Sequence, residues 1–67
     1  MTKETFSIPN ISCGHCTMTI KNELEELEGV ARAEGSVDEK NVTVEWDEPT
    51  TRGKILDTLR EINYPAA

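Results

Sequence analysis

The order of hydrophobic and polar residues along the chain predicts a strand followed by a helix in its first half. Phe6 and Ile8 alternate with polar residues, which is typical of a strand, and this strand should end at Pro9. Apolar residues then recur at helical spacing, which predicts a helix over Gly14–Glu28 with Gly29 as its terminator. Glutamate is common at the other positions of this helix, so one face should be buried and the rest solvated.

The middle of the chain predicts two strands joined by a polar turn. Every second residue over 31–37 is small or apolar, and the same alternation continues over 42–46. If residues 39–40 form the loop of this hairpin, Ala33 lies opposite Trp46. A small residue at that position would leave room for the large indole ring.

A second amphipathic helix is predicted near the carboxyl end. Its buried stripe includes Ile55 and Leu59 and ends at Ile62, and Thr50 or Thr51 is suited to cap its first turn. After this helix, Asn63 is suited to a left-handed conformation. The sequence therefore marks both ends of this helix, with a capping threonine before it and an asparagine after it.

These elements together predict an α+β fold of the ferredoxin-like βαββαβ type. Two helices would cover one face of a four-stranded antiparallel sheet, because that arrangement buries every apolar stripe. Only Tyr64–Ala67 remain for the last strand, and Pro65 confines them to an edge of the sheet. We expect one domain over residues 1–67.

Composition and charge argue against several classes of function. A chain of 67 residues with 36% hydrophobic residues has little core to hollow out, so we do not expect an enzyme with a deep pocket. Its net charge of −6 makes nucleic acids and anionic membrane surfaces poor partners. No apolar run approaches the roughly 20 residues that membrane insertion needs, and residues 1–5 lack the apolar core of a signal peptide. We therefore expect a cytoplasmic protein.

The candidate chemistry lies in the segment Cys13-Gly14-His15-Cys16, between the first predicted strand and the first helix. Close-set cysteines in a reducing compartment indicate metal or redox chemistry more often than a structural disulfide. Cys16 falls in the first helical turn, where the helix dipole and free N–H groups favour the thiolate. Thiolate ligands select soft or borderline metals such as Cu(I), zinc and the iron of iron–sulfur clusters.

Several kinds of site share a Cys-x-x-Cys pair. A structural zinc site needs four ligands, and His15 would be strained in reaching back to the same ion as Cys13 and Cys16. An iron–sulfur cluster needs four cysteines. Cys-Gly-His-Cys is also the active-site sequence of protein disulfide isomerases, although those proteins have a longer thioredoxin fold. A metal carrier and a small dithiol oxidoreductase both remain open at this point.

The sequence resembles the heavy-metal-associated (HMA) domain family, and within it the free-standing bacterial copper chaperones. The resemblance rests on five segments: Ile8–Cys16, the helical pattern that follows Cys16, the turn Glu28-Gly29-Val30, the strand Asn41–Asp47 and the ending Leu59–Tyr64. It implies a βαββαβ fold that binds Cu(I) through two cysteines. It also implies delivery of the copper to the metal-binding domain of a copper-transporting P-type ATPase.

Carried over to this chain, the resemblance makes Cys13 and Cys16 the metal ligands. Tyr64 matches an aromatic residue that bacterial members place near the metal. Ile11 stands where the family usually has a methionine that packs under the loop, and isoleucine can pack there in the same way. His15 either tunes the thiolates or ligates a second copper in a metal-bridged homodimer, or it is an exposed polar residue of the first turn.

The sequence thus predicts a cytoplasmic Cu(I) chaperone that is not an enzyme. It would transfer the ion by ligand exchange, in which a partner thiolate attacks low-coordinate copper and one of its two cysteines leaves. The alternatives are a carrier of Hg(II) or Zn(II) and a small dithiol oxidoreductase.

Overall fold

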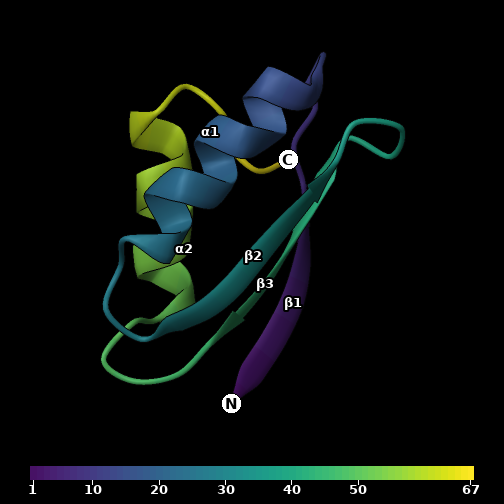
Figure 1. Ribbon diagram of the computed structural model, residues 1–67. Coiled ribbons are helices and arrows are strands. Elements are labelled where there is room, and N and C mark those ends of the chain that lie inside the picture. Colours follow the sequence, from purple (N-terminus) through teal and green to yellow (C-terminus); the bar gives the residue numbers. More distant parts are fainter.

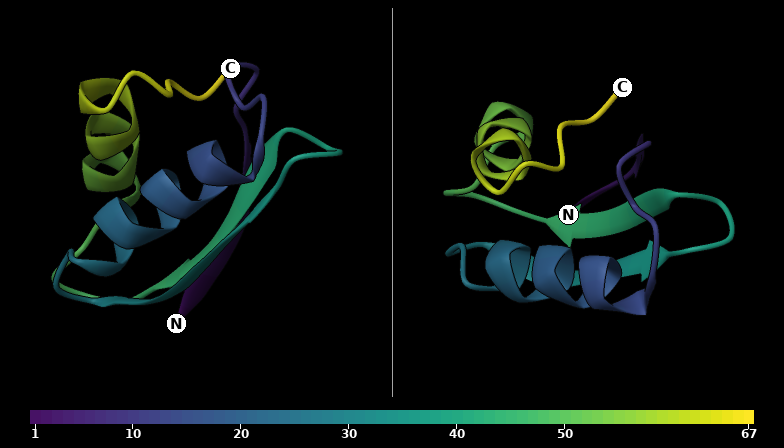
Figure 2. Two further views of the ribbon diagram at one scale, coloured as in Figure 1. Left: turned by 45° about the horizontal axis from the view of Figure 1, so that its top comes forward. Right: turned by 90° about the horizontal axis from the view of Figure 1, so that it is seen from above.

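The computed structural model describes all 67 residues and contains three strands and two helices. Their bounds are β1 Thr2–Ser7, α1 Gly14–Glu25, β2 Val30–Ser36, β3 Asn41–Trp46 and α2 Arg52–Glu61. The strands form one antiparallel sheet in the order β1-β3-β2, and both helices lie against the same face of it (Figures 1 and 2). Neither helix is long and apolar enough to cross a membrane.

The core lies between this sheet face and the two helices. Alternate strand residues such as Phe6, Val42 and Val44 point inward and are almost fully buried. They meet Ile20 of α1 and Leu59 of α2, which come from the predicted stripes and have no exposed surface. Most polar residues of the strands form the opposite, solvated face, as the alternation predicted. Glu4 is an exception, because it lies on the helix side and pairs with Arg52 of α2 at 2.8 Å.

The expected fourth strand is absent. The segment Tyr64–Ala67 returns to the end of β1, but only the N–H of Ala67 donates a hydrogen bond to it, to the carbonyl of Ser7 at 2.8 Å. Pro65 has no N–H to offer, so this segment cannot continue a ladder of hydrogen bonds. The prediction of a four-stranded sheet was therefore wrong, and β1 remains an edge strand.

The register of the hairpin also differs from the prediction. Ser36 pairs with Asn41, so the loop holds the four residues 37–40, and Lys40 takes a left-handed conformation with φ of 53°. Ala33 therefore lies opposite Val44, and the residue opposite Trp46 is Val30. Because the register differs by two residues, Ala33 and Gly35 keep the face that the pattern assigned to them. A register shift between Val30 and Arg32 leaves Ala31 exposed, so Val30 takes the inward position that the pattern gave to Ala31.

The small residues of β2 make room for helix α1, not for the indole ring. A Cβ atom added to Gly35 would lie 2.7 Å from Cβ of Thr17 in α1. A side chain at position 35 would therefore push α1 away from the sheet. This close approach matters for function because α1 carries Cys16 in its first turn.

The ends of the helices follow the predicted signals, with one shift. Thr51 caps α2 and accepts a hydrogen bond from the N–H of Lys54 at 3.2 Å, and Asn63 has a left-handed φ of 68°. Helix α1 ends at Glu25, three residues before the predicted end, and the chain continues in a tighter turn in which the N–H of Leu27 donates to the carbonyl of Leu24.

Replacing Gly35 with alanine should lower the free energy of unfolding by about 1–3 kcal/mol, as overpacking in a close contact typically does. The matched control is Gly53→Ala in α2, where the nearest atom to an added Cβ is 3.9 Å away. That variant should be neutral or stabilised by up to about 1 kcal/mol. Urea denaturation followed by circular dichroism measures both, and equal stability of the two variants would contradict the close approach of α1 to β2.

Candidate metal centre

The loop that carries the cysteines is anchored by two buried isoleucines. Ile8 and Ile11 have no exposed surface, and the N–H of Ile11 donates to the carbonyl of Ile8 at 3.1 Å. Ile11 thus packs under the loop, as expected for the residue at this position. The exposed residues Ser12 and Cys13 follow directly, so the chain reaches solvent just before α1 begins.

The two cysteines face one another across the first turn of α1. Cys13 is the N-cap residue with extended backbone, and its carbonyl accepts a hydrogen bond from the N–H of Cys16 at 3.0 Å. The two Sγ atoms lie 3.8 Å apart, and both cysteines are free thiols. Cys13 is exposed, whereas Cys16 keeps only 8% of its surface exposed and belongs to the core.

The surroundings of Cys16 favour its thiolate. They lower the pKa of this thiol to about 6, with the hydroxyl of Tyr64 as the largest cause and hydrogen bonds from Ser12 next. The Ser12 hydroxyl lies 3.6 Å from the Cys16 sulfur, and burial opposes the shift. The same contact raises the pKa of Tyr64, because its hydroxyl is held by the sulfur. Near neutral pH, Cys16 is therefore largely a thiolate.

Tyr64 reaches the cysteines because the end of α2 turns the chain back over the loop. Asn63 is left-handed, and the next N–H, that of Tyr64, donates to the carbonyl of Leu59 at 2.9 Å. The amide of Asn10 donates to the carbonyl of Asn63 at 3.0 Å, which ties the cysteine loop to this segment. Two parts of the chain far apart in sequence thus form one end of the molecule (Figure 1).

The structure brings together Cys13, Cys16 and Tyr64 from the predicted set and places Ile11 beneath them. His15 has an exposed side chain in the first turn of α1. Sequence reasoning assigned no role to Ser12 or Asn10. The position of Ser12 next to a helix start was a usable signal, but nothing in the sequence pointed to the contact between Asn10 and Asn63.

The donor set is limited to two sulfurs. No group of three or more histidine, cysteine, aspartate or glutamate side chains comes together anywhere in the chain. Structural zinc sites are almost always four-coordinate, so one chain cannot complete such a site. A soft ion that accepts two thiolate ligands fits the arrangement, with Cys13 on the solvent side.

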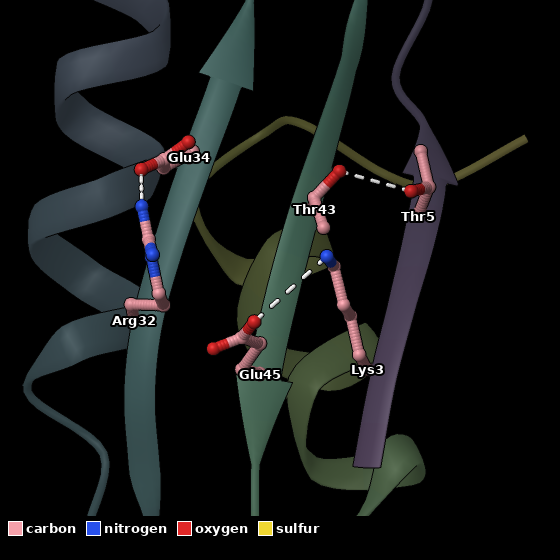
Figure 3. Close-up of a pocket in the computed structure, with 6 residues that line it drawn as sticks. All are labelled: Lys3, Thr5, Arg32, Glu34, Thr43 and Glu45. Carbon is pink, nitrogen blue, oxygen red and sulfur yellow. Dashed lines mark hydrogen bonds and ion pairs between the residues drawn. The ribbon is translucent and has the colours of Figure 1, made fainter.

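A concave region on the opposite face of the sheet has a different character (Figure 3). This hollow of about 360 Å³ is lined only by polar side chains: Lys3, Thr5, Arg32, Glu34, Thr43 and Glu45. Its charges pair with one another, as between Arg32 and Glu34, and the hydroxyls of Thr5 and Thr43 lie 2.9 Å apart. It is a neutralised, solvated sheet face and contains no sulfur ligand.

The sequence matches the heavy-metal-associated domain over residues 5–65. The chain belongs to this family. The match spans both candidate ligands and Tyr64, so the family assignment covers the whole metal centre. The resemblance found in the sequence is thereby confirmed.

Relatives of this HMA domain carry names that concern two different metals. This chain is 42% identical to the COP-associated protein of Helicobacter pylori over 57 residues, and the alignment covers 85% of this chain and 86% of the relative. It is 32% identical over 65 residues to the copper chaperone CopZ of Staphylococcus saprophyticus, with 96% of each chain covered. It is 30% identical over 64 residues to the periplasmic component of a mercuric transport protein of Salmonella typhi, covering 94% of this chain and 70% of the relative.

Solved structures confirm the ferredoxin-like fold class. The solution structure of apo-CopP from Helicobacter pylori superimposes with a TM-score of 0.87 at 36% identity, covering 98% of this chain and 100% of that chain. A copper-binding domain of a P-type ATPase superimposes with a TM-score of 0.93 over 100% of this chain and 92% of that chain. At 18% identity, the second likeness shows the fold alone. Two of the relatives' names describe a metal chaperone and a component of a metal transport system.

Replacing Tyr64 with phenylalanine should raise the pKa of Cys16 from about 6 toward its ordinary value, because the thiolate loses its strongest hydrogen-bond donor. Less thiolate should then be present at neutral pH in metal-free, reduced protein. Thiolate absorbance in the ultraviolet, followed against pH, measures this change. Ser12→Ala should cause a smaller rise in the same direction, and an unchanged midpoint in Tyr64→Phe would contradict the contact.

Proposed function

We propose that this protein is a cytoplasmic copper(I) chaperone. It binds one Cu(I) between Cys13 and Cys16 and delivers it to the metal-binding domain of a copper-transporting P-type ATPase. The observation that carries the proposal is the pair of free thiols with sulfurs 3.8 Å apart at an exposed helix start. A reducing compartment such as the cytoplasm keeps such thiols available for metal.

The donor set favours Cu(I) over harder ions. Cu(I) is satisfied by two or three soft sulfur ligands, whereas zinc would have to recruit water, buffer or a second molecule. The neighbours of the cysteines are Ser12, Gly14, His15 and Thr17, so no carboxylate stands beside them. A zinc ion bound tightly would therefore bridge two chains in a homodimer.

The unequal exposure of the two cysteines suggests how the ion is transferred. A partner thiolate would approach from the side of Cys13, which is exposed, and form a three-coordinate intermediate with the copper. One of the two original Cu–S bonds then breaks. When Cys16 becomes the leaving group, Tyr64 and Ser12 stabilise its free thiolate, so this step needs no proton.

The relatives support the copper assignment and one alternative. CopZ of Staphylococcus saprophyticus, named a copper chaperone, is matched over 96% of both chains. The copper-binding domain of a P-type ATPase has the same fold as this chain, so the proposed chaperone and the proposed acceptor share one architecture. Similarity to a mercuric transport protein favours a second candidate, an Hg(II) carrier, because Hg(II) is also a soft ion that binds thiolates.

Replacing Cys13 with serine should abolish tight Cu(I) binding and leave the fold intact, because one thiolate cannot chelate and Cys13 is exposed. Cys16→Ser should also abolish binding, and it should stay folded because Tyr64 and Ser12 are placed to hydrogen-bond the serine hydroxyl. Competition with a chromogenic Cu(I) chelator, together with thermal unfolding, measures both effects. His15→Ala is the control and should keep the wild-type affinity. Wild-type affinity in either cysteine variant would overturn the ligand assignment.

The monomer should prefer Cu(I) over Zn(II) by roughly a thousandfold or more, which corresponds to about 4 kcal/mol. Anaerobic competition between the two ions, read by X-ray absorption and gel filtration, tests this preference. Protein purified anaerobically from copper-supplemented cells should also carry copper. A monomeric zinc site with four protein ligands would refute the copper proposal, and mercury as the only metal retained by cells would favour the Hg(II) carrier.

A further inference from the structure

Strand β2 is an edge strand whose outer hydrogen-bonding groups are partly occupied by side chains. In the order β1-β3-β2 it has a strand neighbour on one side only. The N–H and the carbonyl of Ala33 both point away from β3, since each contacts a side chain of α1. Peptide groups on such an edge are free to pair with another strand unless something covers them.

Lys21 and Glu25 cover this position in the way a neighbouring strand would. The carboxylate of Glu25 accepts the N–H of Ala33 at 3.1 Å, and the ammonium of Lys21 donates to the Ala33 carbonyl at 3.4 Å. The two side chains also pair with each other at 2.8 Å. Lys21 and the N–H of Ala33 lower the pKa of Glu25, so this carboxylate stays ionised at neutral pH.

The next outward-facing position of the same edge is less protected. By the alternation of an antiparallel strand, the peptide groups of Gly35 point in the same direction as those of Ala33. Gly35 has no side chain to shield them, and it lines a groove of about 600 Å³ between α1 and β2. Exposed Met18 lies on the helical side of this groove. The pair Lys21–Glu25 is therefore the covering of this edge that α1 provides.

The sequence of β2 is complementary to itself. If two copies paired antiparallel with Ala33 opposite Ala33, those residues would exchange both of their N–H···O=C hydrogen bonds. Arg32 of each copy would then lie opposite Glu34 of the other. Both side chains stand on the solvated face of the sheet, where they now pair within one strand (Figure 3). Two opposite-charge pairs across the new contact would favour this register.

The other edge of the sheet is less suited to self-pairing. The outward carbonyl of Ser7 in β1 already accepts the N–H of Ala67. In an antiparallel β1–β1 pair centred on Thr5, Lys3 would lie opposite Ser7, with no charge to complement it. The C-terminal segment would also have to leave.

We propose that the free edge of β2 is a pairing surface for a second copy of this chain, held closed by Lys21 and Glu25. When these side chains leave Ala33, two sheets join into one of six strands. The contact needs no metal, so it is distinct from a dimer bridged through the cysteines. The ion pair of Lys21 and Glu25 thus keeps the protein monomeric, and the surface of α1 and the metal loop stay accessible.

The test is sedimentation of metal-free, reduced protein in the presence of a chelator, from micromolar to millimolar concentration. Wild type should remain monomeric, and the double variant Lys21→Met with Glu25→Ala, which leaves no side-chain partner for either group of Ala33, should form a dimer as concentration rises. The matched control is Arg60→Met with Asp57→Ala, which removes an ion pair within α2 that touches no strand. That control should remain monomeric. Circular dichroism verifies that each variant is folded.

A charge reversal tests the register. Adding Glu34→Arg to the double variant places arginines opposite each other and should weaken the dimer about tenfold. Adding Arg32→Glu as well restores opposite charges and should restore the dimer. A folded double variant that stays monomeric overturns the proposal, as does a dimer that ignores the charge of residue 34. Wild type that dimerises as strongly as the variant overturns the role of Lys21 and Glu25. Because metal is absent throughout, none of these results depends on the copper proposal.

Discussion

The packing of one short loop on the core supports everything at the metal end of the molecule. Ile8 and Ile11 are fully buried on one side of the cysteines, and Cys16 itself belongs to the core. This burial fixes where α1 starts and so holds the two sulfurs 3.8 Å apart. A core that forms from apolar side chains needs no metal to hold it, unlike that of a zinc finger. The binding energy of the ion is then not consumed in folding the chain, which suits a protein that must release its cargo.

The sequence predicted local structure correctly where a short residue pattern or a single residue type favours one conformation. Alternating Phe6 and Ile8, the apolar stripes of the helices and the capping residue Thr51 all predicted local structure correctly. The placement of Cys13 before the helix and Cys16 within its first turn followed from the same signals. These features depend on neighbours close in sequence, and they need no knowledge of how distant segments meet.

The predictions that failed depend on contacts between distant segments. The hairpin register was wrong because its loop has four residues, and several loop lengths fit the same alternation of apolar positions. Ala33 was predicted to make room for the indole of Trp46, but it lies opposite Val44. The close approach on β2 is instead that of Gly35 to Thr17, which only the packing of α1 on β2 reveals. The contacts of Asn10 with Asn63 and of Tyr64 with Cys16 join opposite ends of the sequence.

The course of the last residues has a practical consequence for how this domain can be joined to others. Its carboxyl end lies beside the cysteine loop, tied there through Ser7 and Asn63, whereas its amino end lies at the far end of the sheet (Figure 1). A fusion partner or affinity tag attached after Ala67 would restrict access to the thiols and disturb the contact that orients Tyr64. The same addition before Met1 would leave the metal loop free. In any tandem array, a neighbour attached at the amino end is therefore the one that leaves room for docking.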